Sequence, residues 1–145
     1  YIWEGVPEKS DNPTYSLPNL TNLGRIDMND THLAIGCYPG GSSFKVLELS
    51  SLSAPSYQTV PGQDCPSEVS FNEKGLFIPS DDKIIGWNSI SDALAGSSPT
   101  MSFGGRTDKT NMGTKMASGI SWDGYHFWVG EYKFSNRLLG FLPSK

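Results

Sequence analysis

The sequence predicts an all-β fold built from repeated units of four short antiparallel strands. Three segments that begin at Gly24, Ser67 and Ser118 align without a gap, at spacings of 43 and 51 residues. Such self-similarity is typical of stacked or radial repeat proteins. The remaining apolar runs are short and rich in Val, Ile, Phe, Trp and Tyr, and they are separated by Gly, Pro, Asn, Asp and Ser. These residue types favour strands joined by tight turns.

The aligned segments predict the first two strands of each unit and the turn between them. They read GRIDMNDTHLAI (residues 24–35), SEVSFNEKGLFI (67–78) and SGISWDGYHFWV (118–129). Asn-Asp, Asn-Glu-Lys-Gly and Asp-Gly lie at the centres of these segments, and such residues tolerate the backbone of a hairpin turn. The apolar positions coincide in four columns: Ile26, Val69 and Ile120; Met28, Phe71 and Trp122; Leu33, Leu76 and Phe127; and Ile35, Ile78 and Val129.

Two further segments recur and predict the third and fourth strands. The third-strand segments are YIW (residues 1–3), KVLEL (45–49), KIIGW (83–87) and RLLGF (137–141). The fourth-strand segments are PTYSL (13–17), PSYQT (55–59) and PTMSF (99–103). The best helix candidate is ISDALA (90–95), which is too short to form more than one turn within a loop.

Four-stranded repeats of this length are typical of β-propeller blades. The chain then divides as one propeller segment: residues 1–22 are the outer strands of a first blade, 23–62 and 63–111 are blades, and 112–145 form an incomplete last blade. This amounts to about three and a half blades, whereas closed propellers have roughly four to eight. Because an incomplete ring leaves open sheet edges, we expect a fragment of a longer propeller, half of a ring that a second copy completes, or one subunit of a filament.

The motifs resemble those of the NHL-repeat propellers. In that family a hydrophobic strand leads to an Asp-Gly turn, a second strand ending in Val-x-Asp, then Asn-Arg and a third strand. Residues 117–141 (ASGISWDGYHFWVGEYKFSNRLLGF) follow this pattern best, and residues 2–17 resemble the linker between third and fourth strands. The resemblance implies a scaffold and no particular chemistry. The Asp after the second strand is absent from all three units, which have Gly36 or Cys37, Ser80, and Gly130 with Glu131 there, so the resemblance does not extend to a site that depends on it.

Composition and charge narrow the class of protein. Of 145 residues, 37% are hydrophobic and only 18% are charged, as in a soluble β protein with a substantial core. A net charge of -4 and the lack of a basic run argue against a nucleic-acid surface, and no apolar run is long enough to span a membrane. Low charge with abundant Ser, Thr and Asn is common among exported proteins, so we expect an extracellular or cell-surface location. Tyr1 opens no signal-peptide pattern, as in a processed N-terminus or a chain that never had a signal.

Cys37 and Cys65 are the two cysteines of the chain. In the propeller register Cys37 ends the second strand of one blade and Cys65 opens the next blade, on the same face of the disc. This arrangement favours a disulfide, with two unpaired apolar thiols as the alternative. The sequons Asn19-Leu20-Thr21 and Asn29-Asp30-Thr31 make Asn19 and Asn29 candidates for N-glycosylation.

Catalytic and metal-binding patterns are weak. His32 and His126 share one column beside a hairpin turn, where a structural role is expected, and no GxSxG motif occurs. We expect no catalytic residue, no bound metal and no cofactor. The loop carboxylates could suit a structural calcium ion, but they lack the spaced calcium-loop pattern, and solvated side chains are the expected role. The carboxylates assigned to the face that bears the cysteines are Asp64, Glu68, Asp81, Asp82, Asp108 and Glu131.

The aromatic residues divide into core and surface candidates. The four tryptophans, Trp3, Trp87, Trp122 and Trp128, fall in strand columns and are expected to pack between blades. Tyr38, Tyr132 and Phe134 lie in loops that leave second strands and could contact a ligand. The candidate binding residues are Tyr38, Asp64, Asp81, Asp82, Glu131 and Tyr132.

The expected function is that of a non-enzymatic, extracytoplasmic propeller that binds a protein partner or assembles with copies of itself through open blade edges. The alternative is a metal-dependent lyase or lactonase on an NHL-like propeller of which this chain is a portion. RNA binding, known for some propellers of this group, is disfavoured by the sequence pI of about 5.0.

Overall fold

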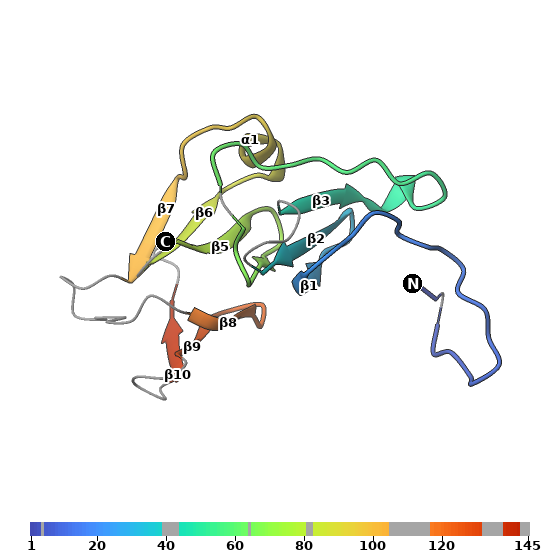
Figure 1. Cartoon of the computed structure of the whole chain (residues 1–145). Helices are drawn as coiled ribbons and strands as arrows, with labels where there is room; N and C mark the ends of the chain where they lie inside the picture. The colour runs from blue at the N-terminus through green and yellow to red at the C-terminus, as the bar shows by residue number, and fades with distance from the viewer. Residues whose placement is uncertain are drawn as a thin grey trace.

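The residues that the structure describes form three small antiparallel β-sheets and one short α-helix (Figure 1). The computed structural model describes residues 1–3, 5–38, 44–63, 65–80, 83–104, 117–131 and 138–142, without the side chains of residues 117, 118 and 131. The expectation of an all-β fold is confirmed. Within the described residues the sheets do not close into a barrel or a complete propeller ring. The first sheet consists of β1 (Leu23–Met28), β2 (His32–Cys37) and β3 (Lys45–Glu48); the second of β4 (Ser70–Phe71), β5 (Leu76–Ser80), β6 (Lys83–Trp87) and β7 (Met101–Gly104); and the third of β8 (Ala117–Trp122), β9 (Phe127–Glu131) and β10 (Leu138–Phe141).

The turn between the first two strands has the same construction in all three sheets. Asn29, Asn72 and Asp123 occupy equivalent positions, and a side-chain oxygen of each accepts hydrogen bonds from the backbone N–H groups two and three residues later, at 2.6 to 3.0 Å. Short Asn and Asp side chains stabilise turns in this way because they replace the missing backbone partners. The aligned turn residues therefore fix the register of each hairpin.

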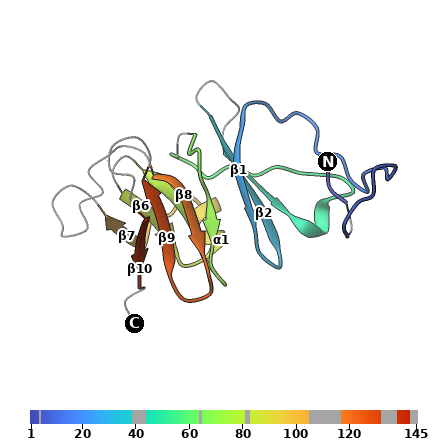
Figure 2. The same ribbon diagram turned by 90° about the horizontal axis from the view of Figure 1, so that it is seen from below.

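The three sheets stack face to face, and the second sheet is covered on both faces. Leu76 and Ile78 of β5 pack toward the first sheet, whereas Phe77, between them in sequence, packs toward the third. This alternation follows from the period of two in a β-strand. The first strands of the sheets are neighbours as well, since β4 lies beside both β1 and β8. Figure 2 shows β1 and β2 on one side of this stack and β8 to β10 on the other.

Among the described residues, a complete fourth strand is present in the second sheet alone. The segment after β3 contributes one antiparallel bridge, Val46 with Gln58, and the N-terminal segment contributes another, Ile2 with Tyr15. All three fourth-strand segments begin with proline, but Pro18 and Pro61 also follow these two closely, and proline lacks the N–H that a longer ladder needs. The segment expected to form a single helical turn does so as α1 (Ile90–Leu94), where the Ser89 hydroxyl accepts a hydrogen bond from the Asp92 N–H.

The N-terminal segment lies against the outward face of the first sheet (Figure 1). Ile2, Leu17 and Leu20 pack on a cluster formed by Leu33, Ile35 and Leu47. The first sheet thus has the second sheet on one face and a partial cover on the other. A short 3-10 helix, Leu49–Ser51, follows β3 beside this cluster.

Candidate binding surfaces

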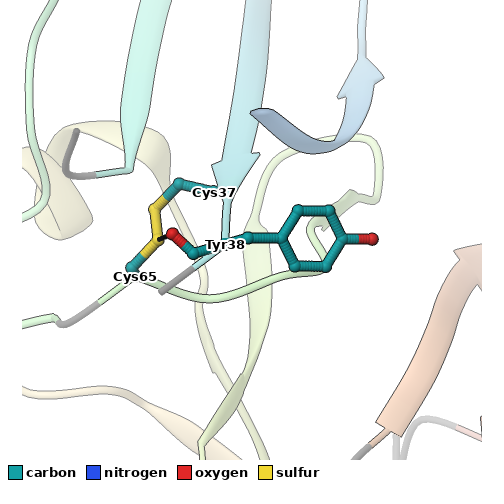
Figure 3. Close-up of a disulfide and its surroundings, with 3 residues drawn as sticks. All are labelled: Cys37, Tyr38 and Cys65. Carbon is teal, nitrogen blue, oxygen red and sulfur yellow. Dashed lines mark hydrogen bonds between the residues drawn. A yellow bond between two sulfur atoms is a disulfide. The ribbon is translucent and has the colours of Figure 1, made fainter. Parts of the chain in front are cut away.

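Cys37 and Cys65 form a disulfide, as the sequence predicts (Figure 3). Their Cα atoms are 5.2 Å apart, within the range for a disulfide. The bond joins the end of β2 to the segment that leads into β4. It therefore connects the first and second sheets on the side of the molecule where β2 ends. The Cys65 sulfur lies 3.2 Å from the Tyr38 carbonyl oxygen. A disulfide sulfur carries no hydrogen, so this is a van der Waals approach.

The backbones of the two sheets come very close at the disulfide end. The Arg25 N–H donates to the Ser67 carbonyl and the Cys37 N–H donates to the Pro66 carbonyl, both at 2.9 Å. A Cβ atom at Gly24 would lie 2.6 Å from the Ser67 oxygen. Glycine is therefore required for this approach, although Ser67 and Ser118 stand at the equivalent positions of the other two units.

A buried carboxylate lies between the first strands at the same end. The Glu68 side chain is almost fully buried, and its Oε2 is 3.1 Å from Nε of Arg25, whose side chain is largely exposed. The two groups form an ion pair, but Oε2 has no well-aligned hydrogen-bond donor. Burial raises the pKa of Glu68 to about 7, and the charge of Arg25 lowers it only in part. Glu68 therefore changes its protonation state near neutral pH.

The turns between the first and second strands of the three sheets surround a hollow of about 470 Å³. This hollow lies at the opposite ends of the strands from the disulfide. Oδ2 of Asp27 accepts a hydrogen bond of 2.7 Å from the Phe71 N–H, and Oε1 of Glu73 accepts one of 3.0 Å from the Trp122 indole. Each bond connects one sheet to the next. Both carboxylates thus have structural partners, and the hollow has an acidic rim.

Asp123 orders the neighbouring turn. Besides its backbone partners it accepts a hydrogen bond of 2.7 Å from the Trp128 indole, and these bonds hold its pKa below the ordinary value. His126 Nδ1 lies 3.5 Å from Oδ2 of Asp123, and His32 Nδ1 lies 2.8 Å from the Thr31 hydroxyl. Both histidines contact their own turns.

An apolar hollow of about 580 Å³ lies on the outward face of the first sheet. The N-terminal segment forms one side with Trp3, Leu17 and Leu20, and the first sheet forms the other with Ile26 and Met28. Ile26 and Met28 are largely exposed there. Exposed neighbouring apolar side chains of this size are typical of protein contact surfaces.

The predicted binding residues are only partly placed. Tyr38 is exposed, and its ring points away from the disulfide (Figure 3). Cys65 and Pro66 line a polar hollow of about 280 Å³, which Tyr38 does not line. Asn19 is exposed with a φ of 59°, and Asn29 is half-buried in its turn. Asp64, Asp81, Asp82, Asp108, Tyr132 and Phe134 lie outside the described residues, as does the side chain of Glu131.

The tryptophans occupy two kinds of environment. Trp87 is buried between the first and second sheets, and Trp122 packs between the second and third. Trp3 and Trp128 lie on the outward faces at the two ends of the stack, with part of each ring exposed. The expectation of packing between sheets is confirmed for the first pair only.

The described residues contain no group of three or more His, Cys, Asp or Glu side chains that could hold a metal ion. In the same part of the chain no helix is long and apolar enough to cross a membrane. Compared with protein-family models, curated proteins and solved structures, the chain gives no match.

Sequence reasoning missed the two inter-sheet contacts of the first strands. It treated Glu68 as a solvated carboxylate and gave Asp27 no role. A signal was present in the aligned segments, where Arg25 and Glu68 share one column and Asp27 and Ser70 share another. Arg25 and Glu68 have opposite charges in one column, and these are the two side chains that the structure pairs between adjacent sheets.

Proposed function

We propose that the chain is a portion of a β-propeller that serves as a non-enzymatic, extracytoplasmic scaffold and associates with further β-sheets through the ends of its stack. The observation that carries this proposal is a difference between equivalent residues. Phe44 and Ile84 are 1% and 0% exposed because a following sheet covers them, whereas Leu138, the equivalent residue of β10 by strand register, is 69% exposed. The third sheet therefore presents a face of the kind that is buried elsewhere in the stack.

The packing of this outward face supports the same proposal. In the second sheet the ring of Phe77 lies against Gly86, and the ring of Phe127 from the third sheet covers it at a centroid distance of 4.1 Å. In the third sheet Trp128 lies over Gly140 in the equivalent way, about 3.0 Å from where a Cβ would be. Burial of apolar surface of this size contributes roughly 1.5 to 3 kcal/mol for each side chain. A covering sheet would thus bind with a substantial hydrophobic contribution.

Two further observations support the proposal: the neighbouring first strands of the three sheets, and the disulfide. The side-by-side first strands β1, β4 and β8 suit blades around a common axis. The disulfide favours an oxidising compartment, and the exposed Asn19 is the better placed of the two glycosylation candidates.

The test is the mass of the native chain in solution, measured by light scattering over a range of concentrations. We expect a mass above the 15.8 kDa of one chain. Leu138→Asp is expected to reduce it to that of one chain, and Val6→Asp, at a fully exposed apolar residue away from the third sheet, is expected to leave it unchanged. A mass of 15.8 kDa at every concentration for the unaltered chain would contradict self-association.

The enzymatic alternative, a metal-dependent lyase or lactonase, has one observation in its favour. A buried carboxylate with a pKa of about 7, such as Glu68, suits a general acid or base. Its nearest charged partner is Arg25, and the described residues bring no second carboxylate or histidine to it as a metal ligand. Loss of lactone hydrolysis in Glu68→Gln, measured with a panel of lactones and added divalent metal, would support the enzyme over the scaffold.

A further inference from the structure

The outward face of the first sheet lacks a cover that the other sheets have. Ile26 is 64% exposed, whereas its equivalents Val69 and Ile120 are 2% and 8% exposed. Met28 is 58% exposed, whereas its equivalent Phe71 is 4% exposed. Val69, Phe71 and Ile120 are buried because each faces the preceding sheet of the stack. The equivalent position before β1 is therefore where a cover is missing.

The N-terminal segment already supplies the outer part of that cover. Ile2 and Tyr15 exchange backbone hydrogen bonds at 2.9 and 3.1 Å, as the paired third and fourth strands β6 and β7 do in the second sheet. Ile2 and Leu17 pack on the cluster around Leu33 and Leu47. The part of the first sheet that stays uncovered is β1. In the other units the equivalent strand is covered by the first and second strands of the preceding unit.

The strand edge next to the bare surface is available for pairing. Ile2 directs its backbone groups to Tyr15, and in an antiparallel strand the residues on either side direct theirs to the opposite edge. No backbone hydrogen bond links Trp3 to another of the described residues. The apolar hollow of about 580 Å³ lies between this edge and β1.

We infer that this surface is the docking site of an antiparallel β-hairpin, which adds one strand to the edge of Tyr1 to Trp3 and lays apolar side chains over Ile26 and Met28. Backbone pairing would give such a hairpin its register, and the hollow would receive its alternate side chains. The inference rests on the stacking of the proposed scaffold, but it does not require self-association.

A hairpin fits this position better than the third sheet of a second copy. That sheet has three strands, and its β10 would need the space in which Ile2 and Tyr15 already pair. A two-stranded hairpin needs only the open edge of the strand at residues 1–3. It leaves the pairing of Ile2 with Tyr15 intact.

The test uses the whole chain with an added hairpin. A copy of residues 67–84, which contains the β4 and β5 hairpin and the start of β6, is placed directly before Tyr1, because the pairing of Ile2 with Tyr15 makes Tyr1 the equivalent of Ile85. The readout is the rate at which peroxide oxidises Met28, measured by mass spectrometry of peptides, with the half-buried Met101 as the internal reference. Because methionine oxidation follows exposure, we expect the extension to slow oxidation of Met28 about tenfold and to leave Met101 unchanged.

A matched control extension has its copy of Phe77 replaced by Asp, because Phe77 is the side chain that faces the following sheet. It has the same length and should give little protection. A second extension, a copy of residues 118–138, guards against failure of the first to fold. Unchanged oxidation of Met28 in both extended chains would overturn the inference. So would protection of Met28 in the unextended chain that grows with protein concentration, since the occupant would then be a second copy. The oxidation rate of Met28 does not depend on the particle mass. The docking inference and the proposed self-association are therefore tested independently.

Discussion

Replacement of Glu68 by glutamine is expected to stabilise the protein at alkaline pH and to remove a pH dependence of its folding. The Glu68 side chain is almost fully buried, and its pKa in the folded chain is about 7, against 4.5 as the ordinary value. The folded protein therefore binds this proton more tightly than the unfolded chain does. The stabilisation is fully present below pH 4.5 and is lost as the pH rises through about 7.

The size of the effect follows from the shift in pKa. Each pKa unit corresponds to about 1.4 kcal/mol, so the free energy of unfolding is expected to fall by roughly 3 kcal/mol between pH 4.5 and pH 8 because of this group. Glutamine keeps the shape of the side chain and does not titrate. At pH 8 the variant should exceed the parent by up to about 3 kcal/mol, and at pH 4.5 the difference should be small.

The assay is urea unfolding followed by tryptophan fluorescence at several pH values from 4.5 to 8. With a denaturant slope of about 2 kcal/mol per molar urea, the midpoint of Glu68→Gln at pH 8 should lie about 1.5 M above that of the parent. Glu8→Gln is the matched control because Glu8 is exposed, and its difference from the parent should not follow this pH course. If Glu68→Gln were less stable than the parent at pH 8, or if its stability fell with pH in parallel, the assigned burial of Glu68 would be wrong.

Three other perturbations test the contacts between and within sheets. Replacing Cys37 and Cys65 together by Ala should lower the free energy of unfolding by about 3 to 4 kcal/mol, because the bond closes a loop across 28 positions. Denaturant midpoints measure this loss, and two alkylatable thiols in the unreduced parent would contradict the bond. Asp27→Ala should cost about 1 to 3 kcal/mol because the Phe71 N–H loses its acceptor, whereas Asp30→Ala, at an exposed turn residue, should cost much less; an equal loss from both would argue against the inter-sheet bond. Gly86→Ala should cost about 1 to 3 kcal/mol because its Cβ would overlap the Phe77 ring, and an unchanged midpoint of thermal unfolding would show that the ring can move aside.

Local structure could be predicted from the sequence because its causes lie within a few residues of each other. The turn residues Asn29, Asn72 and Asp123 stabilise their hairpins through their own neighbours, and the apolar columns define which side of each strand is buried. The one-turn helix is predicted from the local run ISDALA, and the Cys37–Cys65 pair from the repeat register.

The tertiary structure decided what those strands contact. A period of two shows that Ile26 and Val69 face the same way, but only the stacking order leaves Ile26 exposed and Val69 buried, because a strand pattern does not say which sheet lies opposite. In the same way the aligned segments placed Glu68 at a strand start, and its burial and raised pKa come from the close approach of two sheets at Gly24 and Ser67. The sequence by itself determined the hairpins, their registers and the repeat. The inter-sheet contacts, the buried carboxylate and the uncovered face depend on distances between segments far apart in the chain, and these exist only once the sheets have packed.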